Sequence, residues 1–95
     1  EFHGLEMIGE ESFYQKLSSV KDKILKYFLT VHIHPNNCCG MHSVRKFKVP
    51  SVLEVTYLNK TIGNKSNISC NLPHNLDAKN KLKYKDIFLP NYWIK

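Results

Sequence analysis

The most regular hydrophobic pattern along the chain lies between residues 12 and 26. Apolar side chains recur there at offsets of four, three and four, namely Phe13, Leu17, Val20 and Ile24. This spacing predicts an amphipathic helix, with lysines on its outer surface. Ser12, with Gln15 three residues later, matches a capping box at its start.

Two further segments carry the pattern of β-strands. Residues 27–33 are rich in β-branched and aromatic side chains and are stopped by Pro35, so they predict a strand. Residues 52–58 alternate, with Glu54 and Thr56 between apolar neighbours, and predict another strand. The short apolar stretch at residues 1–5 fits the end of a buried strand that runs into a loop. Residues 36–42 are predicted to be a polar loop.

The order strand, helix, strand, strand predicts an α/β fold. The first two strands are expected to be parallel and joined right-handedly, with the third antiparallel beside the second. Val31 and Ile33 should point into the core, while His32 and His34 face the other side. One helix covers only one face of such a sheet, so residues 1–95 are interpreted as a single partial domain. Residues 59–85 are polar and loop-rich, and a short apolar segment follows at residues 87–89.

Charge and composition narrow the classes of function. The chain has 14 Lys or Arg against 8 Asp or Glu, a net charge of +6, and 42% hydrophobic residues. That hydrophobic content is typical of a globular chain rather than a disordered tail. Only two aromatics, Phe47 and Tyr84, are interleaved with the basic residues, so we expect solvated loops and no nucleic-acid site. The longest apolar run, residues 27–33, is too short to span a bilayer.

Cysteines and sequons bear on the compartment. Cys38, Cys39 and Cys70 cannot all pair within one chain, and adjacent cysteines bridge each other only with strain. The pairing left open is one bridge from Cys38 or Cys39 to Cys70, in an oxidising compartment. Glycosylation sequons begin at Asn59, Asn64 and Asn67. Although an Asn-rich chain also produces sequons by chance, they favour the secretory pathway slightly.

The densest group of reactive side chains follows the strand at residues 27–33. It offers five potential metal ligands: His32, His34, Cys38, Cys39 and His42. Their spacing fits no common zinc framework, so we expect no zinc and keep this set only as a fallback. A Cys–His nucleophilic pair from the same segment lacks a third, orienting group.

Several motifs, in this order, resemble the C-terminal part of FkbM-like methyltransferases. They are EFHG at residues 1–4, HIHPNNCCG at 32–40, VPSVLEVTY at 49–57, LP at 72–73, LD at 76–77 and DI at 86–87. The resemblance implies the C-terminal β-α-β-β portion of a Rossmann-like class I methyltransferase sheet, followed by a loop-rich tail.

The resemblance also implies a function for an intact parent protein, which would transfer a methyl group from S-adenosylmethionine to an acceptor. Family members hold this cofactor on a Gly-rich loop that the chain lacks, so the 95 residues alone should be inactive and should not bind it. The partners implied are the missing N-terminal half and a small-molecule or glycan acceptor. The substrate-cleft candidates are Glu1, His3, His34, Asn36 and Asn37. Asn36 and Asn37 could equally serve to form the turn after Pro35.

Two alternatives from other classes remain. One is a non-catalytic secreted or lumenal binding domain that carries glycans. The other is a small zinc-binding module built on the fallback ligands.

Overall fold

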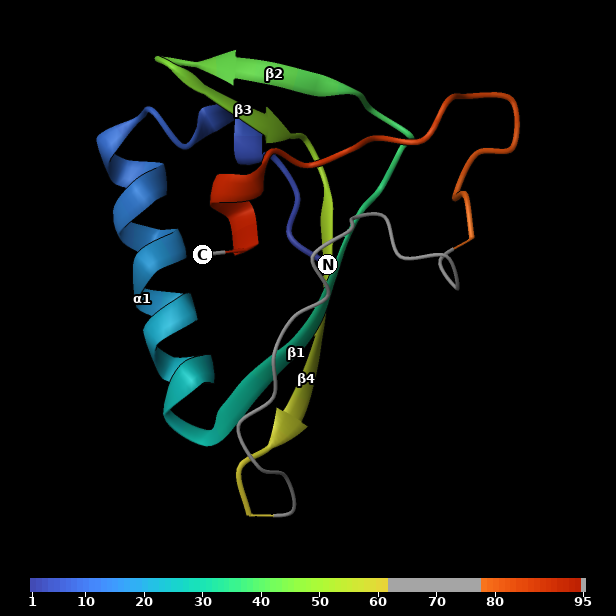
Figure 1. Ribbon diagram of the computed structural model, residues 1–95. Coiled ribbons are helices and arrows are strands. Elements are labelled where there is room, and N and C mark those ends of the chain that lie inside the picture. Colours follow the sequence, from blue (N-terminus) through green and yellow to red (C-terminus); the bar gives the residue numbers. More distant parts are fainter. Residues whose placement is uncertain (62–77, 95) are drawn as a thin grey trace.

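The computed structural model describes residues 1–61 and 78–94. Along this part of the chain lie the 3₁₀ turn η1 (Leu5–Met7), the helix α1 (Glu11–Tyr27), the strands β1 (Phe28–Pro35), β2 (Met41–Val44), β3 (Phe47–Pro50) and β4 (Leu53–Asn59), and the 3₁₀ turn η2 (Asn91–Ile94) (Figure 1). The described residues therefore combine one α-helix with two antiparallel two-stranded sheets, β1–β4 and β2–β3. No helix in these described ranges is both long enough and apolar enough to cross a membrane.

The β1–β4 sheet confirms both strands predicted at residues 27–33 and 52–58, and their antiparallel pairing. Ile33 lies opposite Val55, and His34 lies opposite Glu54. The register shifts between Thr30 and His32, so Val31 sits at an irregularity and is only half-buried. Ile33 is in the core, as its alternation with His32 and His34 predicts.

The hairpin β2–β3 replaces part of the predicted polar loop at residues 36–42. Met41 and His42 begin β2, so the loop is shorter than expected, and Val44 lies opposite Phe47 across a two-residue turn. Each strand has only four residues, too few to show a convincing alternation. The turn is formed by Arg45 and Lys46 instead of the Asn or Gly that usually mark a hairpin.

The N-terminal residues meet β4 rather than β1. Phe2 forms an isolated antiparallel bridge with Leu53, through hydrogen bonds of 2.8 and 2.9 Å. The expectation that residues 1–5 form a strand bonded directly to residues 27–33 is therefore wrong, because β4 lies between them. Gly4 explains why the extended segment stops: its φ of 71° turns the chain into η1.

The helix α1 confirms the amphipathic pattern but not the predicted cap. It begins at Glu11, and its N-cap residue Glu10 makes no side-chain capping bond. Ser12 therefore lies inside the helix, and Gln15 donates to the Glu11 carboxylate at 2.9 Å. Phe13, Leu17 and Ile24 are half-buried, whereas Val20 is 47% exposed and does not belong to the inner face.

The core is a small cluster where the elements meet. Leu5, Ile33, Val49 and Leu53 are buried together, and partly buried neighbours pack around them: Phe2, Ile8, Leu17, Val44, Val55, Leu89 and Trp93. Trp93 belongs to η2, and its indole nitrogen donates to the Lys48 carbonyl at 3.0 Å. The end of the described chain thus returns to β3 and helps to close the core. Of the predicted loop-rich stretch at 59–85, residues 60–61 and 78–85 are described and contain no helix or strand.

Candidate functional site

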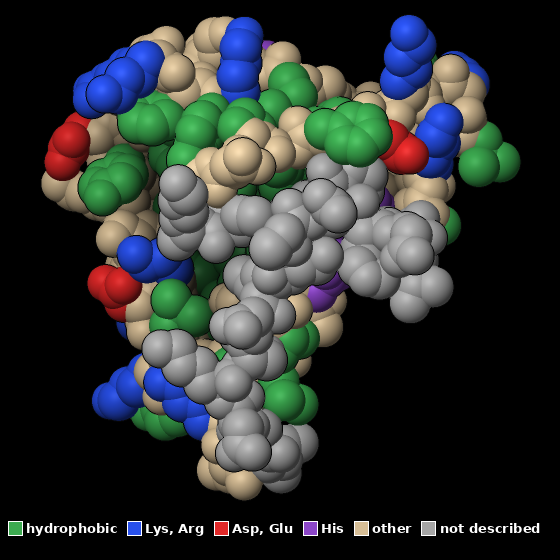
Figure 2. All heavy atoms as spheres, in the orientation of Figure 1, with side chains coloured by type: hydrophobic (Ala, Val, Ile, Leu, Met, Phe, Trp, Pro, Cys, Tyr) green, Lys and Arg blue, Asp and Glu red, His purple; other side chains and the backbone are tan. Residues whose placement is uncertain are grey.

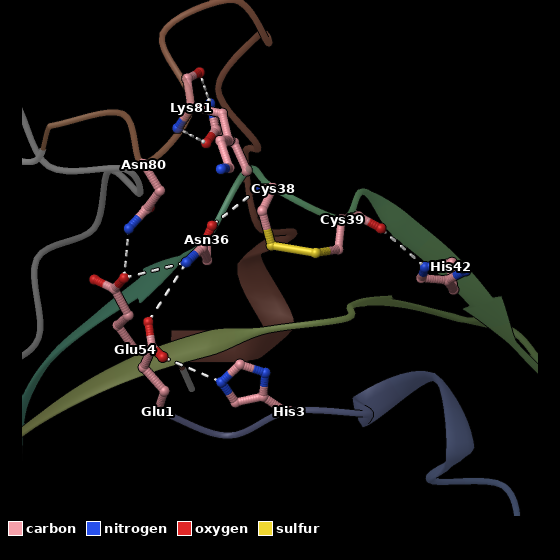
Figure 3. The surroundings of a disulfide bond; sticks show 10 residues. Glu1, His3, Asn36, Cys38, Cys39, His42, Glu54, Asn80 and Lys81 are labelled. Carbon is pink, nitrogen blue, oxygen red and sulfur yellow. Dashed lines mark hydrogen bonds and ion pairs between the residues drawn. A yellow bond between two sulfur atoms is a disulfide. The ribbon is translucent and has the colours of Figure 1, made fainter.

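A group of polar side chains gathers where β1 ends and β4 begins (Figure 3). We call it the polar cluster, and it consists of Glu1, His3, His34, Asn36, Glu54 and Asn80. Four separate parts of the chain supply these residues: the N-terminus, the end of β1, the start of β4 and the segment after residue 78. Four of the five predicted cleft residues, Glu1, His3, His34 and Asn36, belong to it.

His34 and Glu54 form the most enclosed pair of the polar cluster. They lie directly opposite each other in the β1–β4 register, and His34 Nδ1 is 3.1 Å from Glu54 Oε2. The side chains are 10% and 32% exposed, respectively. A carboxylate at Nδ1 favours the tautomer with its proton on Nδ1, which leaves Nε2 as a hydrogen-bond acceptor.

Asn36 joins the two carboxylates of the cluster. Its Nδ2 lies 3.5 Å from Glu1 Oε1 and 3.4 Å from Glu54 Oε1, both within reach of an N–H donor. Its Oδ1 accepts a 2.9 Å hydrogen bond from the backbone N–H of Cys38, which makes an Asx turn. Asn36 therefore forms the predicted turn and also contacts both carboxylates of the cluster.

Glu1 is the exposed end of the cluster. Its Oε2 lies 3.1 Å from His3 Nε2. The hydrogen bond with His3 is the largest cause that lowers the pKa of Glu1 below its usual value, and contacts with Glu54 and Asn36 act in the same direction. Glu1 consequently holds its negative charge in acidic solution better than an isolated glutamate does.

Glu54 and Asn80 are two residues of the cluster that were not among the predicted site residues. Asn80 Nδ2 donates to Glu54 Oε1 at 2.6 Å, so Glu54 is a shared acceptor for three residues of the cluster. An acidic residue inside an otherwise apolar strand was a usable signal for Glu54. Asn80 carries no comparable signal, because its position depends on how the segment after residue 78 returns to the sheet.

Asn37 lies next to the cluster but faces another segment. Its Oδ1 accepts from the Lys81 N–H at 2.8 Å, and its Nδ2 contacts the carbonyls of Lys81, Tyr84 and Lys85 at 3.0 to 3.4 Å. The side chain is buried, with 5% of the residue exposed. Asn37 therefore fastens residues 81–85 to the end of β1.

Cys38 and Cys39 form a disulfide with each other. The alternative of a bridge from either residue to Cys70 is wrong for this structure, and Cys70 itself lies outside the described residues. The reason is local: the two cysteines are neighbours in the turn that the Asn36 side chain forms with the Cys38 N–H, so their sulfurs are within reach of each other.

The fallback zinc ligands do not come together. The two thiols are consumed by the disulfide, and His42 Nε2 contacts the Cys39 carbonyl at 3.2 Å. His32 lies on the same strand face as His34, opposite Thr56. Within residues 1–61 and 78–94, no three His, Cys, Asp or Glu side chains form a group suited to a metal ion.

The remaining predicted features lie at the surface. Asn59 is exposed, and its Oδ1 accepts 2.9 Å hydrogen bonds from the Thr61 N–H and hydroxyl. Asn64 and Asn67 lie outside the described residues. Lysine and arginine side chains appear in several separate places on the face shown in Figure 2.

No protein-family model, curated protein or solved structure matches this chain. The resemblance to FkbM-like methyltransferases therefore stays a prediction drawn from short motifs.

Proposed function

We propose that this chain forms the acceptor-binding part of an S-adenosylmethionine-dependent methyltransferase domain with a Rossmann-like sheet. The observation that carries the proposal is the nearly buried His34, paired with Glu54 across the strands and linked to Glu1 through Asn36. The polar cluster lies around the carboxyl end of β1 and the start of β4, and open α/β sheets bind their ligands at the carboxyl ends of strands. An antiparallel last pair of strands is also what the family resemblance implies.

His34 acts as the proton acceptor for an acceptor hydroxyl. The lone pair on its Nε2 takes the hydroxyl proton as the oxygen becomes a nucleophile, and Glu54 stabilises the imidazolium that results. The exposed carboxylate of Glu1 and the amide of Asn80 offer hydrogen bonds to further hydroxyl groups. A polyhydroxylated small molecule or a glycan suits this arrangement of acceptors and donors.

The described glycines do not provide a cofactor cradle. A Cβ placed on Gly4 would lie 3.7 Å from the Phe13 ring, and one on Gly9 would lie 3.2 Å from Val44. Gly40 has open space, but the element that directly follows it is the strand β2, so no helix N-terminus adjoins this glycine. S-adenosylmethionine, which supplies the methyl group, is thus assigned to residues outside the described part of this chain.

The test uses the longest natural chain that contains this sequence. It measures transfer of labelled methyl from S-adenosylmethionine to a panel of polyols and glycans. We expect His34→Asn to lower kcat by about 100-fold or more, the usual contribution of a general base, with a smaller effect on KM. Glu10→Gln is the matched control, because this exposed residue lies outside the polar cluster.

Two results would contradict the proposal. One is that His34→Asn and Glu10→Gln have the same turnover. The other is that the intact protein neither binds S-adenosylmethionine by calorimetry nor transfers its methyl group. The 95 residues alone are expected to give no binding heat with the cofactor in either case.

A second candidate function is a non-catalytic secreted or lumenal binding domain. The Cys38–Cys39 disulfide and the exposed sequon at Asn59 favour it, because disulfides and N-linked glycans are both typical of secreted proteins. The absence of cofactor binding by the intact protein would select this candidate.

A further inference from the structure

The Cys38–Cys39 disulfide lies in the turn that carries Asn36 and Asn37 into position (Figure 3). Cys38 follows Asn37 directly, and its backbone N–H is bonded to the Asn36 side chain at 2.9 Å. The disulfide closes a ring that includes the peptide bond between the two cysteines. The ring therefore restricts the backbone at the point where both Asn side chains are anchored.

The side chains of Asn36 and Asn37 connect this restricted turn with two different parts of the site. Asn36 Nδ2 reaches Glu1 and Glu54, and so connects the turn with the polar cluster. Asn37 binds the backbone of residues 81–85, the segment that follows Asn80, itself a donor to Glu54. A change in the turn should therefore alter the contacts of Glu54 in two ways, directly through Asn36 and indirectly through the segment that carries Asn80.

The disulfide is also accessible. Cys39 is exposed and Cys38 is half-buried, so a thiolate can approach the Cys39 sulfur from solvent. Gly40, the residue that follows Cys39, is also exposed. Accessible disulfides react readily by thiol–disulfide exchange, whereas enclosed ones do not.

From this arrangement we propose that Cys38 and Cys39 are a redox switch that controls the polar cluster. A dithiol reductant attacks the Cys39 sulfur, which forms a mixed disulfide and releases Cys38 as a thiolate. The second thiol of the reductant then attacks the mixed disulfide and releases Cys39. Two electrons and two protons pass to the protein, the reductant becomes a disulfide, and the ring opens.

The two redox forms differ in function. The oxidised form has the turn closed, with residues 81–85 fastened and Asn80 directed at Glu54. The reduced form has a more mobile turn, and it loses the ordered contact between Asn37 and Lys81. This regulatory role rests on the proposed function only for its effect on methyl transfer, since the structural change can be measured independently.

The experiment compares oxidised protein with protein reduced by dithiothreitol, in the longest natural chain. Differential alkylation and peptide mapping should find Cys38 joined to Cys39 before reduction and two alkylated thiols afterwards. Hydrogen exchange at the Lys81 amide should become roughly three- to tenfold faster on reduction, the range expected from losing one hydrogen bond. Methyl transfer, where present, should fall by a similar factor.

Two variants separate this switch from other thiol effects. Cys70→Ser should respond to dithiothreitol like the native protein, which excludes exchange with the third cysteine. Cys39→Ser should show fast Lys81 exchange whether or not reductant is present. In this variant dithiothreitol should not change Lys81 exchange. The comparison holds even if the variant is less stable, because each sample is measured with and without the reductant.

The outcomes distinguish the switch from the proposed function. If Lys81 exchange is the same in both redox forms, or if mapping finds Cys38 or Cys39 joined to Cys70, the switch is disproved. If Lys81 exchange changes but neither form transfers methyl groups, the switch stands and the methyltransferase proposal fails. If methyl transfer occurs and is indifferent to reduction, the regulatory role fails while the enzyme assignment stands.

Discussion

Asn36 and Asn37 are neighbours in the chain, but their side-chain amides serve different parts of the molecule. Asn36 contacts the two carboxylates of the polar cluster, whereas Asn37 contacts only backbone atoms of residues 81–85. Successive side chains beyond the end of a strand diverge, so one turn can hold both a site and a distant segment. We therefore expect Asn37 to act as a structural anchor of the site.

Replacing Asn37 by Ala should lower stability more than catalysis. The substitution leaves the Lys81 N–H and carbonyl without their partner, and the free energy of unfolding should fall by about 1–3 kcal/mol. Urea denaturation measures this loss, and Asn91→Ala, at an exposed amide, is the control. If turnover falls while the melting temperature is unchanged, Asn37 contacts the acceptor and the anchor role is wrong.

The ionisation of Glu1 should depend on His3. Because the hydrogen bond with His3 is the largest cause of the lowered pKa, His3→Ala should raise the pKa of Glu1 towards its ordinary value of 4.5. Carbon-13 NMR of the side-chain carboxyl during a pH titration measures it, and an unchanged midpoint would exclude the contact. Since the folded-state pKa is lowered, stability from this contact is complete above pH 4.5. It is lost as the pH falls through the folded value.

Among the elements, the β2–β3 hairpin is held by contacts beyond its own short strands. Tyr92 of η2 accepts a 2.7 Å hydrogen bond from the Lys48 N–H, and its ring packs edge-on against Phe47 at 5.5 Å. Trp93 binds the Lys48 carbonyl on the same strand. The hairpin and η2 therefore stabilise each other, although more than 40 residues separate them along the chain.

A substitution in the turn of this hairpin should increase the stability of the protein. Arg45 has a φ of 56°, a left-handed conformation that favours glycine, so Arg45→Gly should raise the free energy of unfolding by about 0.5–1 kcal/mol. Lys46→Gly is the matched control, because Lys46 has no positive φ and should lose stability. Thermal and urea unfolding of the two variants measure the difference. Equal changes in the free energy of unfolding would show that the left-handed conformation of residue 45 does not reduce the stability of the protein.

The elements that the sequence predicted are those with a pattern of their own. The helix and the strands β1 and β4 are long enough for periodicity to identify them, and the side of His34 followed from alternation. The hairpin was missed because four-residue strands show little alternation. Glu54 and Asn80 could not be paired with His34 and Asn36 without the strand register, which depends on contacts between distant segments. The Cys38–Cys39 bond depends on a turn geometry that residue order alone does not specify.

Taken as a whole, the described molecule combines the polar cluster with a disulfide between adjacent cysteines and an exposed sequon residue, Asn59. Asn59 ends β4 at the surface, and its side chain accepts a hydrogen bond from the Thr61 hydroxyl of the same sequon. A glycan there would project into solvent, so the folded protein can accommodate it. The presence of an N-linked glycan at Asn59 would then indicate that the protein passes through the secretory pathway.

Expression in a secretory host should therefore add an N-linked glycan at Asn59. Peptide:N-glycosidase treatment should reduce the mass of the native protein. In Asn59→Gln the decrease in mass should be smaller by the mass of one glycan. Asn64→Gln and Asn67→Gln are the matched controls for the other sequons. An unglycosylated Asn59 in correctly exported protein would contradict this prediction.

The sequence separation of the contacts in the polar cluster has a consequence for the order in which the protein is expected to fold. Asn36 and Glu1 are 35 residues apart and Asn80 and Glu54 are 26 apart, and beside the cluster Asn37 and Lys81 are 44 apart. Closing such long loops is entropically unfavourable, whereas α1 and the β2–β3 hairpin need only local contacts. The cluster is thus expected to assemble after the rate-limiting step. Substitutions in it would then speed unfolding and leave the folding rate nearly unchanged, so the site can vary without slowing the route to the native state.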